Sequence, residues 1–224
     1  MQSNTVFTVS SRINQLDLKN KDIMKPVSIL VLLAGFTLGL TACGPSTESE
    51  VVTEISEAER TAYLDQGKSI AGATFAVLSS RLQKAMGEGG VPEAINYCQL
   101  NAYRLVDSLS KVHKATIRRT SLLARNPADR PSELEREILE TYAGEDAAGQ
   151  ELKPMVRALE NQEVVFFAPI RTNAFCLNCH GTPGETLKEE DYALIRRHYP
   201  EDNAIGYQDG DLRGMWSIRF RRQE

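Results

Sequence analysis

Cys176-Leu177-Asn178-Cys179-His180 is a C-x-x-C-H motif, and the rest of the chain has to fold around whatever this motif binds. The spacing is the attachment signature of a c-type haem, because its two thiols can form thioethers with the two vinyl groups of one haem. The adjacent histidine can then supply the proximal ligand of the iron. We therefore predict one covalent haem c, attached by Cys176 and Cys179 and bound through its iron by His180.

Two other kinds of site use the same residue types. A thioredoxin-like redox pair opens a helix after a buried strand, whereas this motif lies in a stretch rich in Gly, Pro, Thr and Asn. A structural zinc site needs four ligands, and Cys98 would complete such a set with Cys176, Cys179 and His180. Haem c is the favoured prediction, because the sequence contains no second C-x-x-C pair and no H-x3-H pair.

The N-terminus has the pattern of an export signal, which haem c attachment requires. Residues 27–40 form an apolar run that is shorter than the roughly 20 residues of a membrane span. Basic residues precede this run, and small residues follow it. This order predicts a secretory signal peptide over residues 1–42. A translation start at Met24 would make the signal more compact.

The predicted signal peptide ends in Leu40-Thr41-Ala42-Cys43, which resembles a bacterial lipobox. Cleavage before Cys43 and lipidation of this residue would tether the protein to a membrane. An ordinary cleavage site followed by an incidental cysteine is the alternative. Gly44, rather than an aspartate, follows Cys43, and this favours the outer membrane over the inner one. We therefore expect a lipid-anchored periplasmic protein.

Length and charge limit the remaining possibilities. The chain has 224 residues and a formal net charge of −4, so it is a poor candidate for binding nucleic acid, which selects basic surfaces. Residues 44–50 are polar and predict a tether, so residues 43–56 are expected to form a lipidated N-terminus and its tether. Residues 57–222 are long enough to form one domain with its own core.

Hydrophobic periodicity and turn residues predict a mixture of helices and strands. We expect helices over residues 57–86, onward from Pro92, onward from Ser132 and over residues 189–199, and strands over residues 116–122, 164–168 and 215–220. Glycines in residues 87–90 separate the first two helices, and Ser132 with Glu135 forms a capping-box pattern. Helices come first and strands gather late, which predicts an α+β fold.

Several short stretches occur in an order and spacing that resemble a known family. They are residues 94–98 (AINYC), 117–121 (IRRTS), 125–127 (RNP), 176–181 (CLNCHG), 199–200 (YP), Ala204, 206–207 (GY) and 210–217 (GDLRGMWS). This combination resembles the PAS-like c-type haem domain family, found as single cytochromes and as sensor modules ahead of histidine kinases. The resemblance spans residues 57–222. It implies a PAS-like antiparallel sheet with flanking helices and a long N-terminal helix.

A six-coordinate iron needs a second axial ligand besides His180. The chain offers six candidates: His113, His198, Cys98, Met86, Met155 and Met215. Both histidines lie in charged stretches typical of solvated surface, whereas Cys98 lies on the apolar face of the helix predicted from Pro92. A buried structural cysteine is the alternative for Cys98. The family resemblance implies that Cys98 is the sixth ligand.

Other residues are candidates for contacts with the haem periphery. Arg118, Arg119 and Arg213 could pair with the propionates, because a guanidinium binds a carboxylate through two hydrogen bonds. Salt bridges on the surface of a strand are the alternative for these arginines. Tyr207 is a candidate hydrogen-bond donor near the haem.

Electron transfer to a redox partner is the favoured function of such a domain. The alternative is a redox or diatomic-gas sensor that acts through a separate partner protein. A peroxidase-like enzyme would need an open distal position with acid–base groups, for which the sequence offers no visible context. We therefore do not expect an enzyme.

Overall fold

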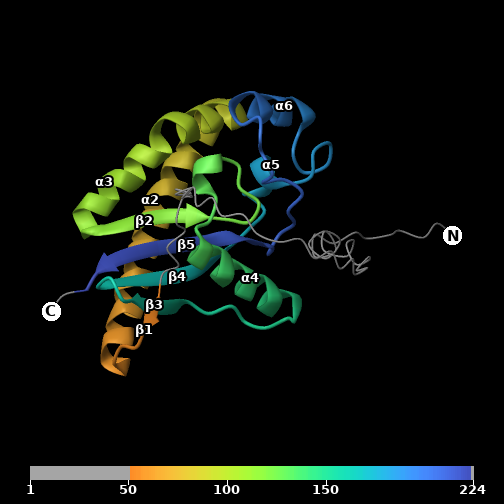
Figure 1. Cartoon of the computed structure of the whole chain (residues 1–224). Coiled ribbons are helices and arrows are strands. Elements are labelled where there is room, and N and C mark those ends of the chain that lie inside the picture. The colour runs from red at the N-terminus through yellow and green to blue at the C-terminus, as the bar shows by residue number, and fades with distance from the viewer. Residues whose placement is uncertain (1–50, 223–224) are drawn as a thin grey trace, which may run out of the picture. The chain divides into compact units, whose positions relative to one another are not determined.

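The computed structural model describes residues 51–222, in which an antiparallel sheet lies between helices. The strand order is β1-β3-β4-β5-β2, with all neighbours antiparallel. The strands are β1 (Val52–Thr53), β2 (Ala115–Thr120), β3 (Met155–Leu159), β4 (Glu163–Arg171) and β5 (Leu212–Arg221). An open antiparallel sheet with flanking helices confirms the predicted α+β, PAS-like class (Figure 1).

The longest helix of the described residues is α2 (Glu57–Tyr97), which packs against one face of the sheet. It begins at a capping box in which Ser56 and Glu59 satisfy each other's backbone N–H groups. Gly89 and Gly90 have non-helical backbone angles, with φ at +66° for Gly90, and these angles kink the helix where the glycines predict a break. Pro92 follows in the first turn of the second segment, where its missing N–H does no harm.

The polypeptide stays helical after Tyr97, in agreement with the helix predicted onward from Pro92, but the form of the helix changes there. A π-helical turn, η1 (Cys98–Ala102), leads directly into α3 (Tyr103–His113). Lys114, in the left-handed region with φ at 50°, ends α3. The turn begins at Cys98, and π-helical turns inside α-helices occur frequently at functional sites.

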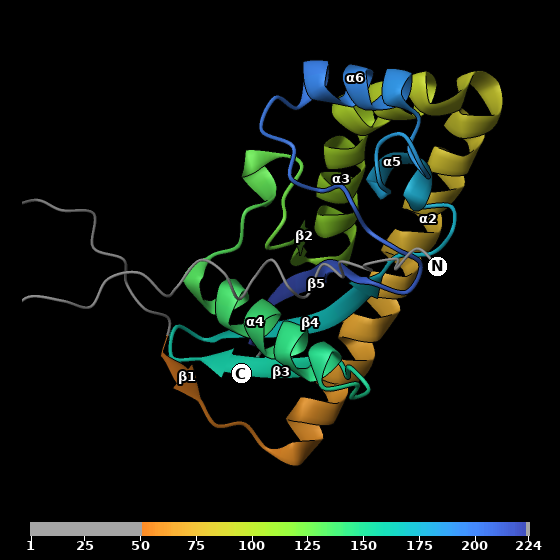
Figure 2. The same ribbon diagram turned by 90° about the vertical axis from the view of Figure 1, so that its right-hand side faces the viewer.

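Helices cover both faces of the sheet (Figures 1 and 2). On one face, α2 and α3 bury Trp216, Ile218 and Phe220 of β5, which all lie within the strand predicted over residues 215–220. On the other face, α4 (Glu133–Ala147) packs against Met215 and its neighbours. The capping box predicted for Ser132 and Glu135 is confirmed at the start of α4.

Two short helices lie beyond one end of the sheet. They are α5 (Leu177–His180) and α6 (Glu189–His198), and Ile195 of α6 packs against Val91 and Ile95 of α2. A single 3-10 turn, η2 (Pro127–Asp129), follows β2. No helix within residues 51–222 is long and apolar enough to cross a membrane. The predicted signal peptide and Cys43 lie outside the described residues.

Candidate haem site

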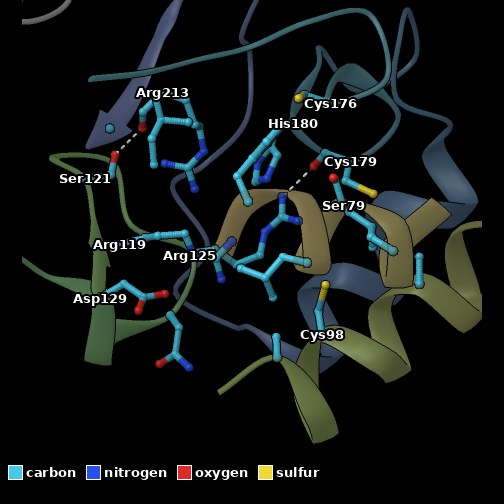
Figure 3. Close-up of a pocket in the computed structure, with 18 of the residues that line it drawn as sticks. Ser79, Cys98, Arg119, Ser121, Arg125, Asp129, Cys176, Cys179, His180 and Arg213 are labelled. Atoms are coloured by element: carbon cyan, nitrogen blue, oxygen red, sulfur yellow. Dashed lines mark hydrogen bonds between the residues drawn. The ribbon is translucent and has the colours of Figure 1, made fainter. Parts of the chain in front are cut away.

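A cavity of about 430 Å³ lies where α2, η1 and α5 meet the ends of β2, β4 and β5. This volume falls in the range of roughly 300–1,000 Å³ that is typical of small-molecule and cofactor pockets. Its walls are largely apolar, formed by Phe75, Leu78, Leu82, Met86, Ile95, Ile170 and Trp216. Polar and sulfur-containing side chains converge in it: Cys98, Arg119, Arg125, Asp129, Cys176, Cys179, His180 and Arg213 (Figure 3).

The C-x-x-C-H motif forms the short helix α5 and the turn before it. Asn173 begins this turn, since its side-chain oxygen accepts hydrogen bonds from the backbone N–H groups of Phe175 and Cys176. Cys176 and Cys179 are both half-buried and are not joined by a disulfide. Burial raises the pKa of Cys179 to about 11. The motif therefore presents two free thiols at one side of the cavity.

The ring of His180 is fixed by its surroundings. Its Nδ1 atom lies 2.7 Å from the carbonyl oxygen of Ala204, and because a carbonyl can only accept, Nδ1 carries the proton. Tyr207 packs edge-on against the imidazole, with the ring centroids 6.3 Å apart. Desolvation, together with the nearby charges of Arg125 and Arg213, lowers the pKa of His180 well below its usual value. A neutral imidazole with Nε2 free is the form that binds metals.

Arg125 is a cavity residue that was not among the predicted site residues, although it begins the 125–127 stretch that contributes to the family resemblance. Its Nε atom forms an ion pair with Asp202 at 3.2 Å, and its side chain is only 12% exposed. The same guanidinium donates to the carbonyl oxygens of Cys179 and Ala204. It therefore connects the motif to the segment that holds the His180 ring.

Cys98 enters the cavity from the other side. It lies at the first position of η1, and in Figure 3 its sulfur points from the helix toward the centre of the cavity, into which His180 projects from α5. Burial raises the pKa of this thiol, and the charges of Arg119 and Arg125 oppose the rise. Within residues 51–222, no group of three or more His, Cys, Asp and Glu side chains is arranged to hold a metal ion. The Cys₃His zinc set is therefore not assembled.

The three candidate arginines do not share one environment. Arg119 lines the cavity and lies over Trp216, 5.9 Å from the ring centroid. Arg118, the preceding residue in β2, points to the opposite face, where it forms an ion pair with Glu135 at 3.4 Å. Adjacent residues of a strand face opposite sides of a sheet, so Arg118 lies outside the cavity.

Arg213 lies at the polar end of the cavity. Its guanidinium stacks over Tyr207 at 5.3 Å and donates to the carbonyl oxygen of Leu123 at 3.2 Å. Its Nε atom is buried and has no hydrogen-bond partner. A buried donor without a partner is costly, and a carboxylate in the cavity would satisfy it. Tyr207 itself lies behind the His180 ring rather than on the cavity wall.

The residues that converge here match the parts of a haem c. Figure 3 shows the thiols of Cys176 and Cys179 on one side of the cavity and Arg119 and Arg213 on the other. A haem likewise has its vinyl groups and its propionates at different edges, with the iron between them. Thiols for the vinyls, imidazole for the iron, guanidinium for the propionates and apolar walls for the macrocycle are all present.

Comparisons with known proteins point in the same direction. Residues 45–221 match the family described as "Tll0287-like: Tll0287". A solved structure, "Crystal structure of the cyanobacterial heme-protein Tll0287", is similar with a TM-score of 0.52 and 20% sequence identity. The similarity covers 76% of this chain and 99% of that chain. At this identity the likeness establishes the fold. No curated protein matches.

Proposed function

Since this chain belongs to the Tll0287-like family, we propose that its PAS-like domain binds haem. The similar cyanobacterial structure is described as a haem protein. The proposed site is the cavity between α2, η1 and α5, because its lining supplies a partner for each part of the cofactor.

We further propose that one haem c is attached through Cys176 and Cys179, with His180 and Cys98 as its axial ligands. The observation that carries this proposal is the meeting of all four side chains in one cavity, although Cys98 is far from the motif in the sequence. Two free thiols beside a histidine with an available Nε2 are what attachment and proximal ligation require.

Other residues of the chain then have defined tasks. Arg213, with its unpartnered Nε, and Arg119 would each pair with a propionate. Ala204 holds the proton of His180 on Nδ1, away from the metal-binding nitrogen. The apolar wall around Phe75 and Leu82 would exclude water from the macrocycle. When bound, the haem supplies one-electron redox chemistry.

Electron transfer is the function that this site supports best. The protein offers one residue for each axial position, His180 and Cys98, and a site with both positions occupied favours electron transfer over binding a substrate or a gas. We also propose that lipidation of Cys43 anchors the protein in the periplasm, as the lipobox-like sequence suggests.

Sensing of redox state or of a diatomic gas is a second candidate. The location of Cys98 at the start of η1 favours it, because a π-helical turn inside a helix is an irregular element that can rearrange. Loss of the Cys98 contact would open one axial position. Stable binding of carbon monoxide or nitric oxide at low concentration would favour sensing, whereas fast electron exchange without gas binding would favour electron transfer.

Covalent attachment is tested with the wild-type protein and the Cys176→Ala/Cys179→Ala double variant, both produced with a haem c attachment system. We expect the intact mass and the pyridine haemochrome of the wild type to report one covalent haem per chain. The double variant should have no covalent haem. Covalent haem in the double variant, or a wild-type protein that contains zinc in place of haem, would refute the proposal.

A further inference from the structure

We propose that Arg125 is the positioning residue of this site. With Asp202 it holds the Ala204 carbonyl in place, and the carbonyl in turn fixes the orientation and tautomer of His180 before any cofactor arrives. That Arg125 positions His180 is argued from contacts within the protein. That this positioning presents Nε2 to an iron rests on the proposed function.

The first step is the ion pair between Arg125 and Asp202. The side chain of Asp202 is completely buried, and that of Arg125 is nearly so. Removing both charges from water is expensive, so a buried pair contributes little net stability unless further hydrogen bonds satisfy it. Here the second carboxylate oxygen of Asp202, Oδ2, is buried without a hydrogen-bond partner, so the pair is not fully satisfied. The guanidinium also donates to the carbonyl oxygens of Cys179 and Ala204, and the pair is therefore better explained by the geometry it imposes than by the stability it adds.

The second step leads from Asp202 to the imidazole. The Oδ1 atom of Asp202 that binds Arg125 also accepts a hydrogen bond from the backbone N–H of Ala204 at 2.9 Å. Ala204 is fully buried, so water does not replace these contacts. Its carbonyl oxygen accepts from Nδ1 of His180 at 2.7 Å. Arg125 and Asp202 thus hold both the N–H and the carbonyl of the residue that orients the ring.

The third step concerns the two segments that this cluster joins. The backbone N–H of Tyr207 donates to the carbonyl oxygen of His180 at 3.0 Å, and that of Gly206 donates to Gly181 at 2.9 Å. These bonds pair the two segments at the C-terminal end of the motif. Arg125 joins the same segments one residue earlier, because its guanidinium donates to the carbonyl oxygens of both Cys179 and Ala204. Without it, we expect the paired segments to remain together while the Ala204 carbonyl loses its fixed direction.

A comparison with the other cavity arginines supports this assignment. The Nε atom of Arg213 is buried without a partner, so that side chain is available to a ligand. The hydrogen bonds of Arg125 are already made to the protein itself. A positioning role and a ligand-binding role make different predictions, because only the first affects His180 in the absence of haem.

The test uses the full chain in the Cys176→Ala/Cys179→Ala background, which cannot attach haem covalently. The tautomer of His180 is read from side-chain ¹H–¹⁵N spectra of the haem-free protein, and haem affinity is measured by titration. We expect a single Nδ1–H tautomer in the background. Adding Arg125→Met should give a tautomer mixture and a haem affinity about 10- to 100-fold lower, the usual effect of losing a residue that orients a metal ligand.

Arg118→Met is the matched control, because Arg118 also pairs with a buried carboxylate but lies outside the cavity. It should leave both the tautomer and the affinity unchanged. Thermal melts check that each variant is folded. If Arg125→Met does not fold, Arg125→Lys decides: it keeps the charge beside Asp202 but cannot reach both carbonyls, so it should show a smaller change in the same direction.

An unchanged tautomer in the folded Arg125 variant would overturn the inference. A loss of haem affinity with an unchanged tautomer would do the same, since it would identify Arg125 as a direct contact of the haem. The proposed function fails independently: if the background binds no haem, the haem-free spectra still decide whether Arg125 positions His180.

Discussion

His180 donates its Nδ1–H to the carbonyl oxygen of Ala204, with 2.7 Å between the two heavy atoms. This contact leaves Nε2 available to a ligand in the cavity that His180 lines. A backbone carbonyl cannot give up its acceptor role, so it enforces one tautomer without adding a charge. This is the orientation that the proposed haem site requires of His180, and the consequences of the proposal can be tested residue by residue.

Cys98→Ala should change the electronic environment of the iron. Loss of a thiolate donor removes negative charge that stabilises the ferric state, so the midpoint potential should rise, on the order of 100 mV within the roughly 0.8 V that axial ligands span. The Soret band should shift as well. Ser79→Ala is the control, because Ser79 lines the same cavity but hydrogen-bonds to a backbone carbonyl. An identical spectrum and potential in Cys98→Ala would remove Cys98 as a ligand.

Arg213→Met should lower the midpoint potential by tens of millivolts, because a nearby positive charge favours the reduced iron. Added salt should weaken the effect only slightly, since the Nε atom of Arg213 is buried. Potentiometric titration of Arg213→Met beside Arg118→Met checks this, as Arg118 pairs with Glu135 away from the cavity. Equal shifts in the two variants would argue against a contact between Arg213 and a propionate.

Asp129→Asn tests how ionisation of Asp129, which lines the cavity, affects the stability of the protein. Burial raises the pKa of Asp129 above its usual value, although a hydrogen bond from Tyr103 and the charge of Arg119 oppose the rise. An acid whose pKa is raised on folding destabilises the native state when it is ionised. The variant without haem should therefore be more stable than wild type at neutral pH. The gain should vanish as pH falls below the pKa of Asp129 in both states; a constant gain in denaturant titrations across pH would contradict this.

Gly67→Ala tests the packing of α2 on the sheet. A Cβ atom at Gly67 would overlap the ring of Phe166 in β4, so we expect a loss of about 1–3 kcal/mol in the free energy of unfolding. Gly72 lies in the same helix, and a Cβ atom there would have no other atom within 4 Å. Gly72→Ala should instead stabilise by about 0.5–1 kcal/mol. Similar effects of the two substitutions in urea unfolding would refute this close approach of α2 and β4.

Cys43→Ala should release the protein from membranes, because it removes the predicted lipidation site. Cell fractionation and intact mass of the mature protein measure the effect. Cys98→Ala, which leaves the lipobox-like sequence intact, should remain with the membrane fraction. Membrane association that survives in Cys43→Ala would count against lipid anchoring.

Local sequence signals predicted much of this fold. The kink at Gly89 and Gly90 and the cap at Ser132 depend on neighbouring residues alone, so they are visible in the sequence. The short strand β3 was not predicted, because its sequence, Met-Val-Arg-Ala-Leu, has no clear alternation of apolar and polar residues. The π-helical turn at Cys98 has no sequence signature either, and only the packed structure reveals it.

The residues of the site likewise differ in whether the sequence alone could identify them. The motif and Cys98 were identified from the sequence, and the structure brings them to one cavity. Arg118 could have been separated from Arg119 by the alternation of strand residues. Arg125 could not have been found in this way, because its partner Asp202 lies 77 residues further along the chain. Its role depends on tertiary contacts that no local pattern encodes.

The most direct test of the central proposal is the electron paramagnetic resonance spectrum of the ferric wild-type protein, recorded together with its pyridine haemochrome. We predict a c-type haemochrome and a low-spin signal characteristic of thiolate ligation, as expected for haem attached at Cys176 and Cys179 and bound by His180 and Cys98. A purified protein without haem would contradict the haem site itself. A c-type haemochrome with a high-spin or histidine–methionine signal would contradict the Cys98 ligation.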